Sequence, residues 1–235
     1  MSSATAAVSQ GYVRFAGCCY LLISALGLFA ETQVRGNLIV AGDASATAAQ
    51  IGAASTLWRS GIVADLCMQL LDIPIIVLFY LLFKRVNAAL NLTATGLNLI
   101  QTAVLVANKL TLMLPLLLAG SSAYLAAFST EQRDALAYLA IQLHGYGFAI
   151  GLLFFALACV IRGYLIIQSQ FFPKILGLVL GLAGVCYLVN TLALLLAPEL
   201  ADTLFPWIML PVLVGELSLS LWMIVKGANV KGHMS

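Results

Sequence analysis

One stretch of the chain, Thr56–Phe83, constrains the fold more than any other. It holds roughly 28 mostly apolar residues, and a helix of that length crosses a bilayer with some tilt. Asp65 and Asp72 lie inside it, seven residues apart, so both project from one face of the helix. An aspartate near the bilayer centre costs about 3 kcal/mol on insertion scales. Other helices must therefore pack against this face and shield it from lipid.

The composition excludes a soluble globular protein. Of the 235 residues, 63% are hydrophobic and only 9% are charged, whereas soluble domains average about 25% charged residues. A net charge of +2 without a basic cluster argues against a nucleic-acid partner. The five cysteines lie in apolar stretches and form no CxxC pair, which predicts buried thiols without disulfides or metal–thiolate sites. The expected surroundings are therefore a lipid bilayer.

The apolar runs predict an all-α fold, a polytopic bundle of six transmembrane helices with short surface helices in the outer loops. We expect one integral membrane domain over residues 1–235, with spans at about 12–34, 56–83, 87–118, 135–161, 174–197 and 204–226. Pro74 should kink the second span. Asp43 should cap a short surface helix, and Ser129 with Gln132 should form a capping box before the fourth span. We favour a retained first helix over a cleaved signal peptide.

Basic residues gather at one set of helix ends. These residues are Arg14, Lys84, Arg85, Arg162, Lys174, Lys226 and Lys231, whereas the opposite ends hold only Arg35 and Arg133. Because basic residues favour the cytoplasmic side, this distribution predicts a multi-pass protein of the inner (plasma) membrane with both termini in the cytoplasm. Trp58 is expected to be an aromatic anchor near the outer interface.

Ionisable side chains are expected to fall at one depth inside the membrane. At about 1.5 Å per residue, Asp65, Lys109 and His144 lie about 14–15 Å from the outer interface and Glu216 about 18 Å. Asp72 lies deeper, toward the cytoplasm. Three further polar side chains can reach the same layer, those of Asn108, Tyr146 and Asn190. The predicted ligand- or ion-binding residues are Asp65, Asp72, Asn108, Lys109, His144, Tyr146 and Glu216.

The charges in this layer do not balance. Lys109 is the best partner for Asp65 because their depths agree. At least one of the other carboxylic acids should then be neutral, hold a cation or contact water. Such an unequal set suits proton or cation coupling, whereas polar side chains between membrane helices also act as structural contacts. Both interpretations stay open for these residues.

The sequence lacks the common motifs of metal, nucleophile and nucleotide sites. It has no HExxH zinc motif, GxSxG elbow or Walker motif, and its one intramembrane histidine cannot supply a pair of haem ligands. We therefore predict no cofactor and no metal, although an Asp65–His144–Glu216 metal site is conceivable. Enzyme activity is uncertain, and its absence is favoured.

The assembled motifs resemble a family of uncharacterised bacterial six-helix membrane proteins, the domain of unknown function DUF4386. The matching stretches are Gly27–Arg35 with Gly42–Ala44, Arg59–Asp72, His144–Gly147 with Ile150–Leu152 and Phe154–Phe155, Phe172–Gly177, and Gly215–Glu216 with Trp222 and Lys226–Gly227. The resemblance covers nearly the whole chain. It implies an integral membrane fold and no established activity.

Three functions follow as hypotheses. The first is a small transporter or permease-like protein with a mid-membrane polar site for a small molecule or ion. The second is an intramembrane enzyme that uses the acids and His144, and the third is a non-catalytic membrane scaffold or regulatory subunit. The sequence does not identify a ligand, and it leaves self-association into a homo-oligomer open.

Overall fold

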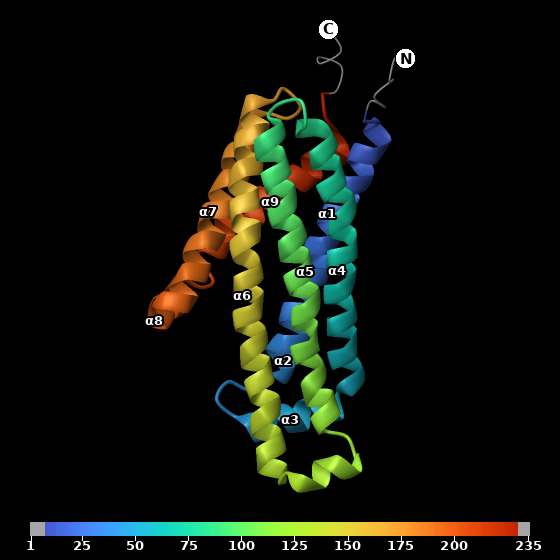
Figure 1. The fold of residues 1–235 in the computed structure, drawn as a ribbon, viewed down its shortest axis with the longest axis vertical. Helices are drawn as coiled ribbons and strands as arrows, with labels where there is room; N and C mark the ends of the chain where they lie inside the picture. Colours follow the sequence, from blue (N-terminus) through green and yellow to red (C-terminus); the bar gives the residue numbers. More distant parts are fainter. Residues whose placement is uncertain (1–7, 230–235) are drawn as a thin grey trace. The chain divides into compact units, whose positions relative to one another are not determined.

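The computed structural model describes residues 8–229, in which every regular element is helical. The elements are α1 (Gln10–Leu28), the π-helix η1 (Phe29–Arg35), α2 (Gly36–Leu38), α3 (Ala44–Ala53), α4 (Ser55–Phe83), α5 (Ala88–Leu118), the 3-10 helix η2 (Ala123–Ala127), α6 (Thr130–Gln168), α7 (Lys174–Leu196), α8 (Pro198–Leu204) and α9 (Met209–Val225). Figure 1 shows these helices in sequence colours. The all-α prediction is confirmed; Lys231, counted above for orientation, lies outside the described residues.

Five helical segments are long and apolar enough to cross a membrane, and α8 with α9, bent by 57°, makes a sixth if the pair forms one span. The five are Gln10–Leu38, Ser55–Phe83, Ala88–Leu118, Thr130–Gln168 and Lys174–Leu196. Many large apolar side chains on these helices are exposed, which suits contact with lipid and not with water. The chain is therefore a multi-pass helical membrane protein.

Two helix boundaries differ from the predicted ones. The first helix continues past 34 through η1 and α2, so residues 35–38 belong to it and not to a connecting loop. The connection between the predicted spans 174–197 and 204–226 is helical, because Pro198 starts α8 at a position where its missing N–H is not needed. Pro74 lies inside an unbroken α4, whose backbone stays helical through it. The predicted kink at Pro74 stays a prediction.

Both predicted caps are confirmed. The Asp43 side chain accepts a hydrogen bond of 2.8 Å from the backbone N–H of Ala46, which begins α3. The backbone N–H of Ser129 donates to Gln132 Oε1 at 2.9 Å, and the Gln132 N–H donates back to the Ser129 hydroxyl at 3.3 Å. These reciprocal bonds satisfy N–H groups that the first turn of α6 would otherwise leave unpaired.

Tertiary contacts divide the chain into two compact units. Unit 1 comprises residues 1–22, 71–102 and 151–235, and unit 2 comprises residues 23–70 and 103–150. Several long helices contribute to both. The single-domain prediction remains a prediction.

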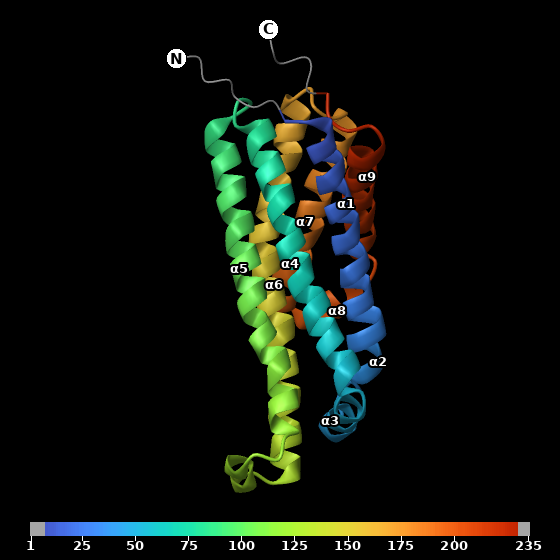
Figure 2. The ribbon, with the colours of Figure 1, turned by 90° about the vertical axis from the view of Figure 1, so that its right-hand side faces the viewer.

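Close helix packing through glycine organises unit 1. A Cβ atom added at Gly163 would lie 2.6 Å from the carbonyl oxygen of Gly177, so α6 and α7 approach backbone to backbone. A Cβ atom at Gly215 would lie 2.8 Å from the carbonyl oxygen of Val179, and α7 and α9 run side by side (Figure 2). At the end of this unit, Gln10 bonds the backbone of Ala228 and ties the start of α1 to the segment after α9.

An apolar core around Trp58 organises unit 2. It consists of Val34, Leu38, Ile51, Trp58, Ile62, Leu112 and Ile141. Trp58 is fully buried, and its indole N–H donates to the carbonyl oxygen of Leu112 at 2.8 Å. Trp58 is therefore a core residue, and its predicted role as an interfacial anchor is wrong. The short α3 lies across the end of α2 (Figure 1) and contributes Ile51 to this core.

Candidate functional site

Asp65 in unit 2 is held by two cations from different helices. Lys109 Nζ on α5 donates to Asp65 Oδ2 at 3.0 Å, which confirms the predicted pair. Arg35 donates through Nη1 to the same oxygen at 2.8 Å and through Nη2 to Oδ1 at 3.4 Å. Asp65 and Lys109 are buried, and the Arg35 side chain is nearly so. The carboxylate is therefore shared by a lysine and an arginine fork.

Arg35 reaches Asp65 because the first helix does not end where the sequence suggested. The residue closes η1, a π-helix, a form that is rare and concentrated at functional sites. Its Nε also donates to the Glu31 carboxylate at 2.8 Å, and the Glu31 side chain is two-thirds exposed. Arg35 thus joins a buried acid to an exposed one. We call Glu31, Arg35, Asp65 and Lys109 the Asp65 cluster; its formal charges cancel.

His144 and Asn108 form a buried pair beside this cluster. The Asn108 Nδ2 donates to the His144 carbonyl oxygen at 2.9 Å and lies 3.0 Å from His144 Nδ1. A Cβ atom at Gly147 would overlap the Asn108 amide, so the glycine leaves room for this side chain. The Phe148 ring lies 5.7 Å from Lys109 Nζ and 6.3 Å from the His144 ring. His144 therefore faces the protein interior, as predicted.

Asp72 belongs to a second polar group, in unit 1. Its Oδ2 accepts hydrogen bonds from Asn98 Nδ2 at 2.7 Å and from the Thr102 hydroxyl at 3.3 Å. Arg162 Nη1 donates to the Asn98 carbonyl oxygen, and the guanidinium lies 5.1 Å from the centre of the Phe79 ring. Arg162 is only 4% exposed. It was counted among the basic residues at helix ends, and its side chain is buried against Asn98 and Phe79.

Glu216 also lies in unit 1. The Tyr187 hydroxyl donates to Glu216 Oε1 at 3.2 Å, and the Tyr187 ring meets Phe155 edge-on at 5.6 Å. Among the described residues of unit 1, no cation forms an ion pair with Glu216. Of the four ionisable residues expected at one depth, Asp65, Lys109 and His144 belong to unit 2, and Glu216 belongs to unit 1.

Tyr146 does not join the polar side chains. It is 43% exposed, although His144 two residues earlier is buried. Two residues turn a helix by about 200°, so a side chain at this spacing projects from the opposite face. Tyr146 therefore faces away from the buried polar side chains, and its role as a binding residue stays a prediction.

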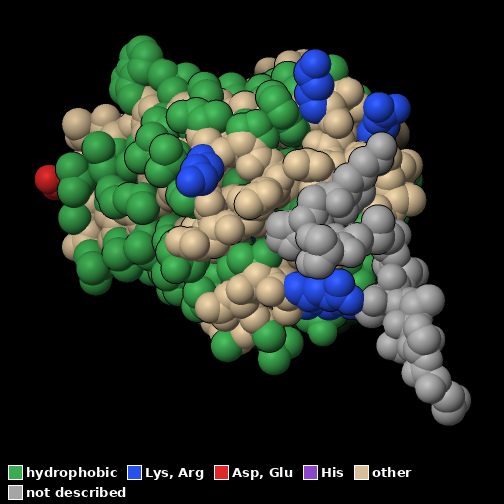
Figure 3. Space-filling model, turned by 90° about the horizontal axis from the view of Figure 1, so that it is seen from above, with side chains coloured by type: hydrophobic (Ala, Val, Ile, Leu, Met, Phe, Trp, Pro, Cys, Tyr) green, Lys and Arg blue, Asp and Glu red, His purple; other side chains and the backbone are tan. Residues whose placement is uncertain are grey.

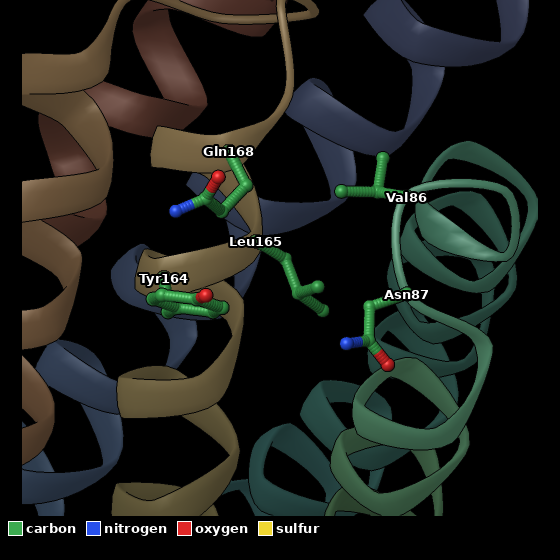
Figure 4. Close-up of a pocket in the computed structure, with 5 residues that line it drawn as sticks. All are labelled: Val86, Asn87, Tyr164, Leu165 and Gln168. Atoms are coloured by element: carbon green, nitrogen blue, oxygen red, sulfur yellow. The ribbon is translucent and has the colours of Figure 1, made fainter.

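The two cavities that we describe lie near the ends of helices in unit 1. One of about 260 Å³ is lined by Val86, Asn87, Tyr164, Leu165 and Gln168 (Figure 4). The other, of about 390 Å³, is lined by residues 170–173, Trp222 and residues 226–229. Exposed basic side chains lie at the start of α1, after α4, at the start of α7 and after α9. Figure 3, which views the molecule from above, shows Lys and Arg side chains in blue.

Within residues 8–229, no group of three or more His, Cys, Asp and Glu side chains is placed to hold a metal ion. Sequence reasoning missed two residues of these polar groups, Arg35 and Arg162. Each lies near the end of an apolar run, where a basic residue normally extends toward water. The one signal in the sequence was the presence of more buried acids than buried bases.

Comparisons with known proteins identify the family and nothing closer. No curated protein matches the chain, and no solved structure does. The model of the family described as Domain of unknown function (DUF4386) matches residues 15–227, which is most of the chain and includes both polar groups. The protein is a member of the DUF4386 family of membrane proteins.

Proposed function

We propose that this protein is a small transporter or permease-like protein whose ligand- or ion-binding site is the Asp65 cluster with its neighbours Asn108 and His144. One observation carries the proposal: the buried Asp65 is shared by Lys109 and by Arg35, and Arg35 also binds the exposed Glu31. Ionisable residues inside membrane segments are costly to bury and generally mark solute, ion or proton pathways.

The sharing of Arg35 supports a site whose contacts can exchange. A buried ion pair contributes little net stability compared with apolar packing of the same volume, so stability alone is a weak reason for three buried charges. Arg35 can strengthen its bond to Glu31 when Asp65 is protonated or bound to another cation. A π-helical segment such as η1 is also a frequent feature of functional sites.

The charge balance limits what can bind. Because the four formal charges of the Asp65 cluster cancel, a ligand with a net charge keeps the site neutral only if it replaces one member. A cation or a proton would take the place of Lys109 or Arg35 on Asp65, and an anion would take the place of Asp65 on the two bases. Asp72 and Glu216 in unit 1 are additional candidate proton- or cation-binding residues, because neither is ion-paired with another described residue of that unit.

A non-catalytic scaffold or regulatory subunit is the second candidate, and one observation favours it. Asp65 and His144 both have protein partners that satisfy them, as polar contacts between membrane helices require. An intramembrane enzyme is a third candidate and has the least support, because Asp65 and His144 have protein partners.

Ligand binding can be followed at Trp58, which lies seven residues before Asp65 on α4. In a Trp207→Phe and Trp222→Phe background, Trp58 is the sole tryptophan. We would titrate purified protein with sodium, potassium, choline, acetate and glycine and record its emission. A transporter should show a saturable change with at least one of them, lost in Asp65→Asn and retained in the control Glu131→Gln, at an exposed position outside the Asp65 cluster.

Responses that are equal in wild type and Asp65→Asn would contradict a site at Asp65. A flat response to every solute, together with a stable complex of defined stoichiometry after gentle extraction from membranes, would favour the scaffold.

We also propose that both termini are cytoplasmic and that the membrane is the inner (plasma) membrane. The basic side chains at the start of α1, after α4, at the start of α7 and after α9 support this orientation.

A further inference from the structure

The larger cavity, of about 390 Å³, lies where α7 begins and α9 ends, within unit 1. Its lining comprises residues 170–173, which precede α7, Trp222 on α9 and residues 226–229, which follow α9. The apolar run of α7 starts directly after Lys174, and that of α9 stops directly before Lys226. Such a change from apolar to basic residues marks the end of the hydrocarbon region. The cavity therefore lies at the depth of the lipid headgroups.

Hydrogen bonds hold the two sides of this cavity together. The Asn229 N–H donates to the carbonyl oxygen of Phe171 at 2.9 Å, which joins the segment after α9 to the segment before α7. The Ala228 N–H donates to Gln10 Oε1 at 3.1 Å. Gly227 has a φ of +73°, a conformation that favours glycine and lets the chain turn directly after α9. The lining is therefore fixed by the fold.

The lining combines apolar rings with polar side chains. Phe171 and Phe172 are buried, and Trp222 is half-buried. The exposed lining residues all have polar side chains; they are Gln170, Lys226 and Asn229. The Lys226 ammonium group can donate to an anion, and the Trp222 indole N–H can donate as well. A lysine in such a position is a common ligand of phosphate groups.

The segments around this cavity are basic. The sequence has no Asp or Glu in residues 135–198 or 217–235, which include every residue that lines the cavity. None of the ion pairs between described residues includes Lys226. Lys174 adds a second exposed cation directly after the lining residue Pro173. A cavity with these charges attracts anions.

Exposed apolar side chains lie beside the cavity on both helices. Val225 follows Trp222 by three residues and so lies on the same face of α9. Ile175 and Leu178 lie in the first turns of α7, and all three side chains are exposed. Exposed apolar side chains on a membrane helix contact acyl chains. A phospholipid can therefore use both the cavity and the adjoining surface, whereas a free anion can use only the cavity.

We propose that this cavity binds a phosphate group, that of an anionic phospholipid such as phosphatidylglycerol. Lys226 would bind the phosphate oxygens, and basic pockets at the ends of membrane helices bind lipid headgroups in this way. Phosphatidylcholine is disfavoured, because its quaternary ammonium group would lie close to Lys226 and Lys174. The volume of the cavity lies in the range of ligand pockets. The site shares no residue with the Asp65 cluster and goes beyond the proposed function.

Native mass spectrometry of the full-length protein in detergent tests the proposal, since orientation in a membrane does not affect the result. The first phosphatidylglycerol should bind at least about fivefold more tightly than the first phosphatidylcholine, as expected for one lysine near a headgroup. Lys226→Gln should remove this preference, and Lys226→Arg, which keeps the charge, should retain it. Arg14→Gln, which removes an exposed cation of unit 1 outside the cavity, is the matched control and should bind as wild type does.

A pair of glutamine variants separates the cavity from the surface charge. Gln170→Trp places a large side chain at the cavity from an exposed position and keeps Lys226, so it should also weaken phosphatidylglycerol binding by about fivefold or more. Gln168→Trp, exposed and two residues earlier, does not line this cavity and should leave binding unchanged. Equal affinities in these two variants, or equal affinities of wild type for the two lipids, would overturn the proposal.

Calorimetry with sodium phosphate distinguishes the lipid from a free anion. We expect no saturable heat, because inorganic phosphate makes no contact with the apolar side chains of Ile175 and Val225. Saturable phosphate binding that is lost in Lys226→Gln, together with equal affinities for the two lipids, would assign the cavity to a free anion and overturn the lipid.

Discussion

Lys109 Nζ and Asp65 Oδ2 lie 3.0 Å apart in a buried ion pair, and the same oxygen accepts from Arg35 at 2.8 Å. The two cations come from helical segments far apart in the sequence. Asp65 therefore joins α5 to the end of the first helix, and removing any one member leaves its partners with incomplete compensation.

Lys109→Met should destabilise the protein. Removing one partner of a buried pair costs about 3–5 kcal/mol of unfolding free energy. Because Arg35 still compensates Asp65, we expect a loss of about 3 kcal/mol for this variant. The double variant Asp65→Asn with Lys109→Met should lose less than the sum of the single variants, because their effects are coupled. Unfolding in mixed micelles measures each free energy. Lys174→Met, at an exposed position, is the control, and a Lys109→Met loss no larger than that of the control would contradict the prediction.

Gly147→Ala should disturb the pair of His144 and Asn108, and Gly145→Ala should not. A Cβ atom at position 147 would overlap the Asn108 amide, whereas one at position 145 meets nothing within 4 Å. Overpacking costs about 1–3 kcal/mol, and alanine in place of a helical glycine gains up to about 1 kcal/mol. Thermal unfolding should therefore move in opposite directions for the two variants. Equal shifts would show that Asn108 moves aside without loss.

Gly163→Ala should loosen the contact between α6 and α7. Its Cβ atom would lie 2.6 Å from a backbone oxygen, which cannot rotate away as a side chain can. We expect a loss of about 1–3 kcal/mol in unfolding free energy. Gly181→Ala on the facing helix is the control, because its Cβ atom meets nothing within 4 Å. A stability equal to that of the control would mean that the helices separate at little cost.

Fusions at the C-terminus should show a cytoplasmic location. In a bacterial host, green fluorescent protein fused there should fluoresce, and alkaline phosphatase fused there should be inactive. The basic side chains near the ends of α1, α4, α7 and α9 are the physical reason. Replacing Lys174 and Lys226 with glutamine tests that reason by shifting part of the population to the opposite orientation. Active phosphatase in the unmodified chain would reverse the assignment.

Part of the Asp65 cluster was predictable because depth along a helix follows from counting residues. The rise of about 1.5 Å per residue matched Asp65 with Lys109, and the pair forms. The same count grouped Glu216 with them, although Glu216 bonds Tyr187 in unit 1. The depth of a residue along its helix does not determine which neighbouring helix its side chain contacts.

The arginines were not predictable for a related reason. Arg35 and Arg162 lie near the ends of apolar runs, where sequence alone favours an interfacial position. In the structure, η1 extends the first helix and carries Arg35 to Asp65, and Asn98 on α5 accepts from Arg162. Both outcomes depend on how separate helices are rotated and packed against each other.

By itself the sequence determined that this is an all-helical membrane protein, where most helices run, and how two of them are capped. Hydrophobic length and side chain–backbone hydrogen bonds are local properties and can be evaluated residue by residue. Only the tertiary structure decided which cations meet Asp65, that Trp58 is a core residue and that Tyr146 faces outward. Those features depend on the rotation and neighbours of each helix, which arise from contacts between residues distant in the chain.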